Sequence, residues 1–193
     1  MIIYVLDTET TGLNGFPDDF VVDIGIVEAD TEANTVTPVF SSVVGYDTDD
    51  WPDEQKDSWI FTHSSLSLEY VKHAPRAKDV ADQVRYILAG KNVTSYNMPF
   101  DFKKFLDHRP WDLTHLNIRR MPDIMEIAAE YFEEPSPFGG YRWPKLDKAY
   151  RELCPQDPAG IAKGQEHRAL SDAVAAGYVL LALYVRGFYE IDE

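Results

Sequence analysis

Cysteine, long apolar runs and basic residues are all scarce in this 193-residue sequence. The single cysteine, Cys154, excludes an internal disulfide framework and fits a reducing cytoplasm. The apolar run at the N-terminus ends at Asp7, so it is too short to span a membrane and lacks the basic leader of a signal peptide. We therefore expect a cytoplasmic protein with no membrane segment.

Positive charge is in particularly short supply. Lys and Arg together number 18 against 33 Asp and Glu, which gives a formal net charge of −15 at pH 7. Proteins that bind nucleic acid usually carry a basic surface, so this balance argues against tight, extended binding to a duplex. Metal ions bound by some of the carboxylates, or a salty cytoplasm, would also account for the excess acid, and composition alone does not separate these explanations.

The pattern of apolar residues predicts a single domain over residues 1–193, with 45% hydrophobic residues to supply its core. Three early strands are expected to form an antiparallel meander, at residues 1–6, 20–29 and 35–44. Helical spacing follows at residues 80–88, 102–106 and 170–184, with a short strand at 92–96 and loops at 47–57 and 133–144. This order predicts an α/β fold with a mixed sheet flanked by helices.

The first motif that carries chemistry is Asp7-Thr8-Glu9-Thr10-Thr11-Gly12, at the end of the first strand. Asp7 and Glu9 are two residues apart, so both side chains point to the same face of a strand. Two carboxylates held that close repel each other and usually require protons or a cation. Oxygen ligands suit Mg²⁺ or Mn²⁺ better than Zn²⁺. Asp-x-Glu alone is common in solvated turns, but the full string after a buried strand is much more specific.

Two further motifs lie downstream. Asn97-Met98-Pro99-Phe100-Asp101 follows a predicted strand and opens a helix, and His167-Arg168-Ala169-Leu170-Ser171-Asp172 leads into the last helix. Taken singly, each has an ordinary structural explanation, because an acid in the first turn of a helix is favoured by the helix dipole and a lone histidine often lies at the surface. Their joint order and local settings favour a functional role.

The three strings resemble the three motifs of the DEDDh 3′–5′ exonucleases, the superfamily of proofreading exonuclease subunits, oligoribonuclease and ribonuclease T. They occur in the same order and span positions 7 to 172, nearly the whole chain. The third string has one residue fewer than the loosest form of its motif, but the five-residue spacing from His167 to Asp172 is the usual one. The resemblance implies a ribonuclease H-like fold.

The resemblance also implies a metal-dependent reaction. Two divalent ions, Mg²⁺ or Mn²⁺, would be held by four carboxylates, with Asp7 bridging both, Glu9 and Asp172 completing the first, and Asp101 holding the second through water. His167 would be the general base for the attacking water. The product would be a nucleoside 5′-monophosphate removed from the 3′ end of a single strand, with DNA slightly favoured over RNA.

Substrate contacts are also implied by the resemblance. The terminal nucleotide would be received by the backbone around Thr10, Thr11, Gly12 and Leu13, with Leu13 as the wedge under the last base. Phe100 would lie beside the sugar, although a place in the core is an equally good expectation for it.

Other polar residues are less informative. Lys103 and Lys104 would reach phosphate, but exposed lysines on a helix are more often simply solvated. His63 stands where relatives carry His-Gly-Ile, and the lack of that glycine leaves its role open. Asp23, inside a predicted strand, and Asp123 are expected to be structural.

Two other hypotheses remain. The chain could be a catalytically silent module of the same fold that binds nucleic acid or a polymerase, but such decayed relatives normally lose a carboxylate or the histidine, and all five residues are present here. A purely stabilising Ca²⁺ or Mg²⁺ site is the third hypothesis, and the lack of an EF-hand pattern argues against it. DNA against RNA as substrate, and a polymerase partner against a homodimer, stay open.

Overall fold

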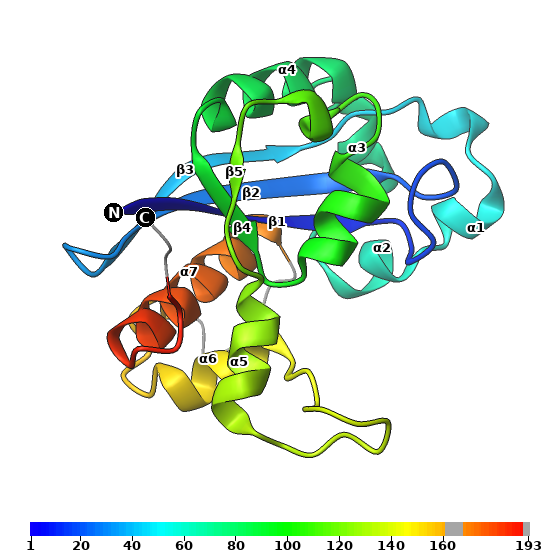
Figure 1. The fold of residues 1–193 in the computed structure, drawn as a ribbon. Helices are drawn as coiled ribbons and strands as arrows, with labels where there is room; N and C mark the ends of the chain where they lie inside the picture. Colours follow the sequence, from blue (N-terminus) through cyan, green and yellow to red (C-terminus); the bar gives the residue numbers. More distant parts are fainter. Residues whose placement is uncertain (161–167, 191–193) are drawn as a thin grey trace.

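A computed structural model describes residues 1–160 and 168–190 of the chain (Figure 1). Its centre is a five-stranded sheet with the order β3-β2-β1-β4-β5. The first three strands are antiparallel, and β4 and β5 run parallel to β1. The strands are β1 (Ile2–Thr10), β2 (Val21–Asp30), β3 (Thr35–Val43), β4 (Asn92–Ser95) and β5 (Arg119–Arg120). The mixed sheet and the opening meander are thus confirmed.

Helices cover both faces of this sheet (Figure 1). One face packs against three helices, α5 (Ile124–Phe132), α6 (Leu146–Leu153) and α7 (Ala169–Val185). The other packs against α4 (Ala77–Leu88), η2 (Pro99–Leu106) and η3 (Leu113–His115). Four short helices follow β3 in the chain, namely η1 (Thr48–Asp50), α1 (Asp53–Lys56), α2 (Trp59–His63) and α3 (Leu68–His73). Among the described residues, none of the helices has the length and apolar character needed to cross a membrane.

Strand β1 shows how the sequence separates the two layers. Ile3 and Val5 belong to the core on the α7 side, while Tyr4 and Leu6 belong to the core on the α4 side. Successive side chains of a strand point to opposite faces, so an unbroken apolar run is what a strand covered on both faces requires. The strand then continues beyond this run through Glu9, which places acidic side chains on a strand whose other residues anchor both cores.

The expected loop over residues 47–57 was wrong in part. Residues 48–50 and 53–56 form short helices there, and neither α2 nor α3 was predicted. These helices are only three to six residues long, which is too short for a helical period to be recognised in the sequence. The 133–144 segment is a loop, as expected, with one isolated bridge between Pro135 and Tyr141.

The first turn of α7 lies unusually close to the sheet at Gly25 of β2. A Cβ atom at Gly25 would lie 2.4 Å from the backbone of Leu170 and 2.5 Å from that of Ala169. Any side chain there would push the helix away, so glycine is required at this position. The close approach brings Asp172, in the first turn of α7, to the acidic end of β1.

Candidate active site

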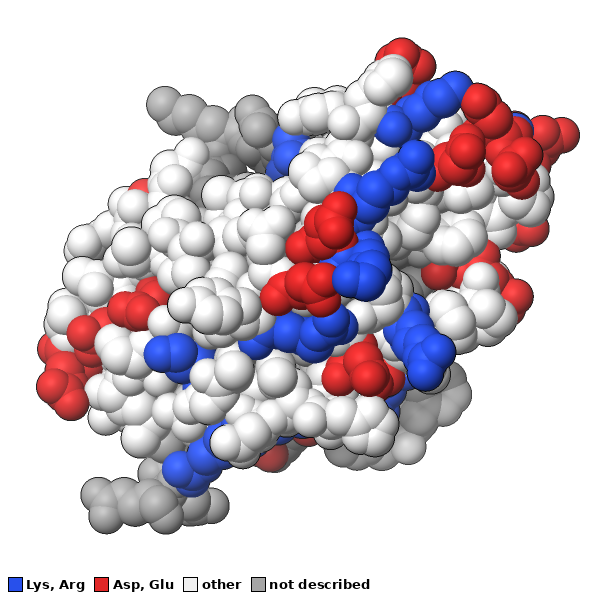
Figure 2. All heavy atoms as spheres, turned by 90° about the horizontal axis from the view of Figure 1, so that it is seen from above, with Lys and Arg blue, Asp and Glu red and all other residues white. Residues whose placement is uncertain are grey.

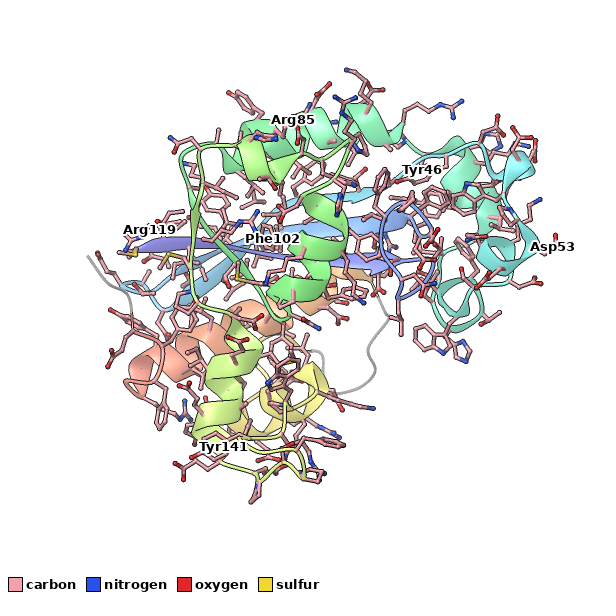
Figure 3. The ribbon with its side chains drawn as sticks, turned by 45° about the vertical axis from the view of Figure 1, so that its right-hand side comes forward. Tyr46, Asp53, Arg85, Phe102, Arg119 and Tyr141 are labelled. Carbon is pink, nitrogen blue, oxygen red and sulfur yellow. The ribbon has the colours of Figure 1, made fainter. Side chains whose placement is uncertain are left out.

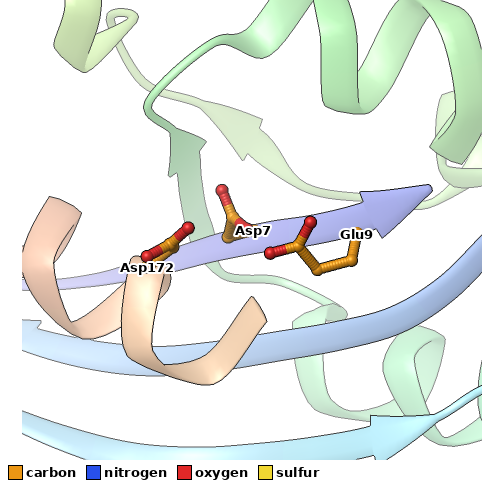
Figure 4. Close-up of side chains that lie close together, drawn as sticks. All are labelled: Asp7, Glu9 and Asp172. Atoms are coloured by element: carbon orange, nitrogen blue, oxygen red, sulfur yellow. The ribbon is translucent and has the colours of Figure 1, made fainter. Parts of the chain in front are cut away.

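Three carboxylates from distant parts of the chain meet beside β1 (Figure 4). One oxygen each of Asp7, Glu9 and Asp172 lies within 4.8 Å of those of the other two. Asp7 and Glu9 come from one face of β1, as the period of a strand requires, and Asp172 comes from α7. We call these three side chains the carboxylate cluster. Their role as metal ligands remains a prediction.

The electrostatics of the cluster favour protons or cations. Burial raises the pKa of Asp7 well above its usual value, and the charges of Asp101, Asp172 and Glu9 raise it further. Burial, with the charge of Asp172, raises the pKa of Glu9 to about 8. The ionised forms of Asp7 and Glu9 are therefore disfavoured by both low dielectric and like charge, and a bound divalent cation would relieve both effects.

Asp101 lies next to the cluster without belonging to it. Its side chain is buried on η2, and one of its carboxylate oxygens accepts a hydrogen bond of 2.7 Å from the Thr8 hydroxyl. Burial raises the pKa of Asp101 to about 7, although the hydrogen bond from Thr8 opposes this shift. Because Thr8 stands between Asp7 and Glu9 in β1, this bond fixes η2 to the strand that carries the cluster.

Replacing Glu9 by glutamine is expected to stabilise the metal-free protein, and more so at high pH. The pKa of Glu9 is about 8 in the fold against an ordinary 4.5, so the folded state holds the proton more tightly than the unfolded chain. Ionisation of Glu9 therefore lowers the free energy of unfolding progressively as the pH rises from about 5 to about 8. The amide removes that loss, and each kcal/mol relieved corresponds to about 2–4 °C in Tm for a chain of this size.

Thermal unfolding in EDTA at pH 5, 6.5 and 8 measures this effect. Glu130→Gln on α5 is the matched control, since Glu130 is exposed and outside the cluster. A Tm difference between Glu9→Gln and wild type that stays constant over this pH range would contradict the electrostatic description of the cluster.

A buried ion pair fixes the beginning of α7. Asp23 of β2 is fully buried, and its carboxylate accepts hydrogen bonds from Arg168 Nε (2.7 Å) and from the backbone N–H of Ala169 (3.1 Å). Asp23 is paired with Glu9 in the register of the sheet. The bonds therefore hold α7 against the strand that flanks the cluster, which agrees with the structural role expected for Asp23. Its sequence signal is an acid inside an apolar strand.

The second motif is held in place by Asp123. Its carboxylate caps α5 by accepting the Met125 N–H at 2.8 Å, and its other oxygen accepts the Met98 N–H at 2.7 Å. The Asn97 carbonyl accepts the N–H groups of Phe100 and Asp101. This acid is thus a structural link between α5 and the segment that carries Asp101.

A pocket of about 400 Å³ opens next to Glu9. Its lining includes every residue expected to contact substrate, Thr10, Thr11, Gly12, Leu13 and Phe100, together with Thr8, Trp59 and Ile60. The side chains of Leu13 and Trp59 are 72% and 53% exposed, so the pocket has large apolar groups at its mouth. A pocket of this size and lining can accept a nucleobase.

Trp59 and Ile60 of α2 were missed by the sequence analysis, because no spacing connects them to the three motifs. The Trp59 ring stacks on His63, with centroids 4.5 Å apart and planes 7° from parallel. His63 Nδ1 also lies 3.1 Å from the Trp59 carbonyl oxygen, and this contact helps to fix the His63 ring against the Trp59 ring. His63 itself is not among the residues that line the pocket.

His167, the expected general base, lies outside the described residues. Its neighbour in the sequence, Arg168, is described and is anchored to Asp23. The structure therefore brings three of the expected carboxylates together with Asp101 beside them, and it places the residues expected to contact substrate around one pocket. The roles of these residues and of His167 stay predictions.

Comparison with known proteins agrees with this geometry. The sequence profile of the exonuclease family RNase T matches residues 4–180. The epsilon subunit of DNA polymerase III from Rickettsia prowazekii is 27% identical over 184 residues, which cover 93% of this chain and 72% of the relative. The corresponding subunit from Rickettsia typhi is 26% identical over the same coverage.

Solved structures with little sequence identity share the fold. A 3′-exonuclease that recognises the 3′ end of a histone mRNA stem-loop has a TM-score of 0.66 at 15% identity, covering 96% of this chain and 64% of that one. E. coli exonuclease I in complex with a dA16 oligonucleotide has a TM-score of 0.64 at 16% identity, with coverage of 96% and 41%. This chain thus spans less than two thirds of either neighbour. By its sequence, its ribonuclease H-like fold and its acidic site, the chain belongs to the RNase T family of DEDDh-type 3′–5′ exonucleases.

Proposed function

We propose that this chain hydrolyses phosphodiester bonds from the 3′ end of single-stranded nucleic acid and releases nucleoside 5′-monophosphates. The observation that carries the proposal is the carboxylate cluster directly beside a pocket of nucleobase size. We further propose that a single domain, residues 1–193, performs the reaction.

The donor set fits hard divalent cations. Asp7, Glu9 and Asp172 offer only oxygen ligands, and burial together with the neighbouring carboxylates raises the pKa values of Asp7 and Glu9. We propose that they hold Mg²⁺ or Mn²⁺, and that Asp101 contributes to a second ion. Such ions, when bound, would lower the pKa of the attacking water and stabilise the leaving 3′-oxygen.

The backbone and side chains of this chain would bind the substrate and accept the proton. The backbone of residues 10–12 would bind the terminal nucleotide, and Leu13 would separate its base from the next one. Phe100, half-buried in the pocket wall, would support the sugar. His167 would take the proton from the attacking water, since histidine ordinarily titrates near neutral pH.

DNA is the slightly favoured substrate, and the relatives support this choice. The relatives named above are epsilon subunits of a DNA polymerase, and exonuclease I was solved with a deoxyoligonucleotide. The neighbour that recognises a histone mRNA end keeps RNA as a second candidate. By analogy with the epsilon subunits we propose a polymerase as partner, with a homodimer as the other candidate assembly, and a cytoplasmic location.

The direction of attack tests this proposal. A linear 20-nucleotide DNA labelled at its 3′-terminal nucleotide is expected to release a labelled nucleoside 5′-monophosphate as its first product in Mg²⁺. A circular single strand of the same composition has no 3′ end and should remain intact. Cleavage of the circle, or labelled oligonucleotides as first products, would show an endonuclease instead. Wild type that degrades neither strand would favour the catalytically silent module.

A further inference from the structure

The charged residues are unevenly distributed along the chain, although the net charge is strongly negative. Residues 72–120 contain ten of the 18 Lys and Arg but only five of the 33 Asp and Glu. This stretch, which forms α4, β4, η2, η3 and β5, therefore carries a net charge of +5 within a chain of −15. One of its five acids is the buried Asp101, which does not contribute to the surface.

The positive charge of this stretch lies at the surface. Eight of its Lys and Arg are exposed against two exposed acids, Asp79 and Asp82. Seen from the α4 side, many Lys and Arg lie along a diagonal across the molecule, with some Asp and Glu between them and other Asp and Glu at both edges (Figure 2). In Figure 3, Arg119 of β5 and Asp53 of α1 lie at opposite ends of the molecule.

Several Lys and Arg of residues 72–120 have no carboxylate within ion-pair distance among the described residues. Asp82 is paired with Lys78 and Arg85, and Arg120 with Asp107. Among the described residues, by contrast, no carboxylate lies within ion-pair distance of Lys103, Lys104 or Arg109. Like charges that are not neutralised locally are available to an anionic ligand.

Lys104 contacts the loop that lines the nucleobase pocket, and Lys103 directly precedes it on η2. Lys104 Nζ donates a hydrogen bond of 2.6 Å to the carbonyl of Leu13, and the Phe16 N–H donates one of 2.9 Å to the carbonyl of Lys104. At Gly15 a Cβ would lie 2.9 Å from that of Lys104, so the loop after β1 packs directly on η2. The pocket and the end of η2 thus form one surface.

An aromatic surface accompanies the cations. The Phe16 ring is 48% exposed and stacks on His108, with centroids 5.2 Å apart and planes 16° from parallel. Arg109 follows directly and borders a shallow apolar hollow of about 190 Å³ that Phe16 also lines. Cations that track a phosphate backbone beside aromatic rings on which bases stack are the elements that single-strand binders combine.

We propose that the surface formed by Lys103, Lys104, Phe16, His108 and Arg109 binds the nucleotides that lie 5′ of the hydrolysed end of a single strand. This proposal rests on the proposed function. It explains how a protein with a net charge of −15 could bind a negatively charged strand. Acidic regions elsewhere on the described part of the chain repel nucleic acid, and this surface offers it a cationic route to the pocket. Phosphates contact the cations, and one base lies on the Phe16–His108 pair.

The test compares Lys103→Glu and Arg109→Glu with Arg151→Glu, which makes the same change in net charge on α6, where Arg151 is exposed and paired with Asp147. Binding is measured without turnover, as the fluorescence anisotropy of a labelled 20-nucleotide thymidine strand in EDTA over a range of salt. Each of the first two variants is expected to weaken binding about tenfold at low salt and to reduce the slope of log affinity against log salt by about 0.7. Arg151→Glu should bind as wild type does.

Hydrolysis of a trinucleotide separates this proposal from the exonuclease proposal. A trinucleotide is too short to use the whole surface, so the ratio of KM for the 20-nucleotide strand to KM for the trinucleotide should rise about tenfold in Lys103→Glu and Arg109→Glu. Equal weakening by all three variants, or wild-type affinity in the first two, would overturn the proposed surface. Wild type that binds the strand through these cations but hydrolyses neither substrate would refute the exonuclease and leave the surface standing.

Discussion

Replacing Asp7 with asparagine is expected to reduce turnover of single-stranded DNA by at least about 10³-fold while the fold remains intact. Asp7 is the carboxylate on which burial and the charges of Asp101, Asp172 and Glu9 act together. An amide is nearly the same size but supplies no negative charge for a cation. Since the ionised form of Asp7 is disfavoured in the metal-free fold, its removal should not lower Tm.

This prediction is tested by measuring the steady-state rate of hydrolysis in Mg²⁺ and Tm on the same samples of Asp7→Asn and wild type. Asp147→Asn, an exposed acid on α6, is the control for loss of one negative charge. If Asp7→Asn kept more than a tenth of the wild-type rate, the carboxylate cluster would not be the metal site.

His167→Ala is the second substitution for which we expect a large effect, a fall in kcat of roughly 10²–10⁴. A general base acts in the chemical step, so its loss should lower kcat while the affinity for Mn²⁺, which depends on the carboxylates, stays at its wild-type value. The rise in rate that accompanies deprotonation of this histidine should also disappear from the pH profile.

Single-turnover rates from pH 5.5 to 8.5 and a Mn²⁺ titration measure both quantities. His115→Ala is the control, because His115 is an exposed histidine on η3. A rate within a fewfold of wild type would mean that another group accepts the proton. A parallel loss of Mn²⁺ affinity would instead give His167 a role in shaping the metal site.

The parts of the fold that follow a regular period could be predicted from the sequence. The continuous apolar run predicts β1 as a strand covered on both faces, and the small and apolar residues of α7 recur at helical spacing. The same strand period predicts that Asp7 and Glu9 share one face. The approach of Asp172 depends on Gly25 and on the Asp23–Arg168 pair, and the sequence alone gives no reason to connect these residues.

Features that arise only from tertiary placement could not be predicted. Trp59 reaches the pocket because α2, a helix of five residues without a visible period, packs beside the end of β1. The cationic surface depends on the loop after β1 lying on η2, which brings Phe16 to His108. The excess of Lys and Arg over residues 72–120 can be read from the sequence, but its position beside the pocket cannot.

A metal-dependence assay tests the central claim most directly. Matched 20-nucleotide DNA and RNA strands labelled at the 5′ end are incubated with wild type and Asp7→Asn in Mg²⁺, in Mn²⁺ and in EDTA. The account predicts a ladder that shortens from the 3′ end in either metal, faster on DNA, and no ladder in EDTA or with the variant. A ladder that persists in EDTA or with Asp7→Asn, or the absence of any ladder with wild type on both strands, would contradict it.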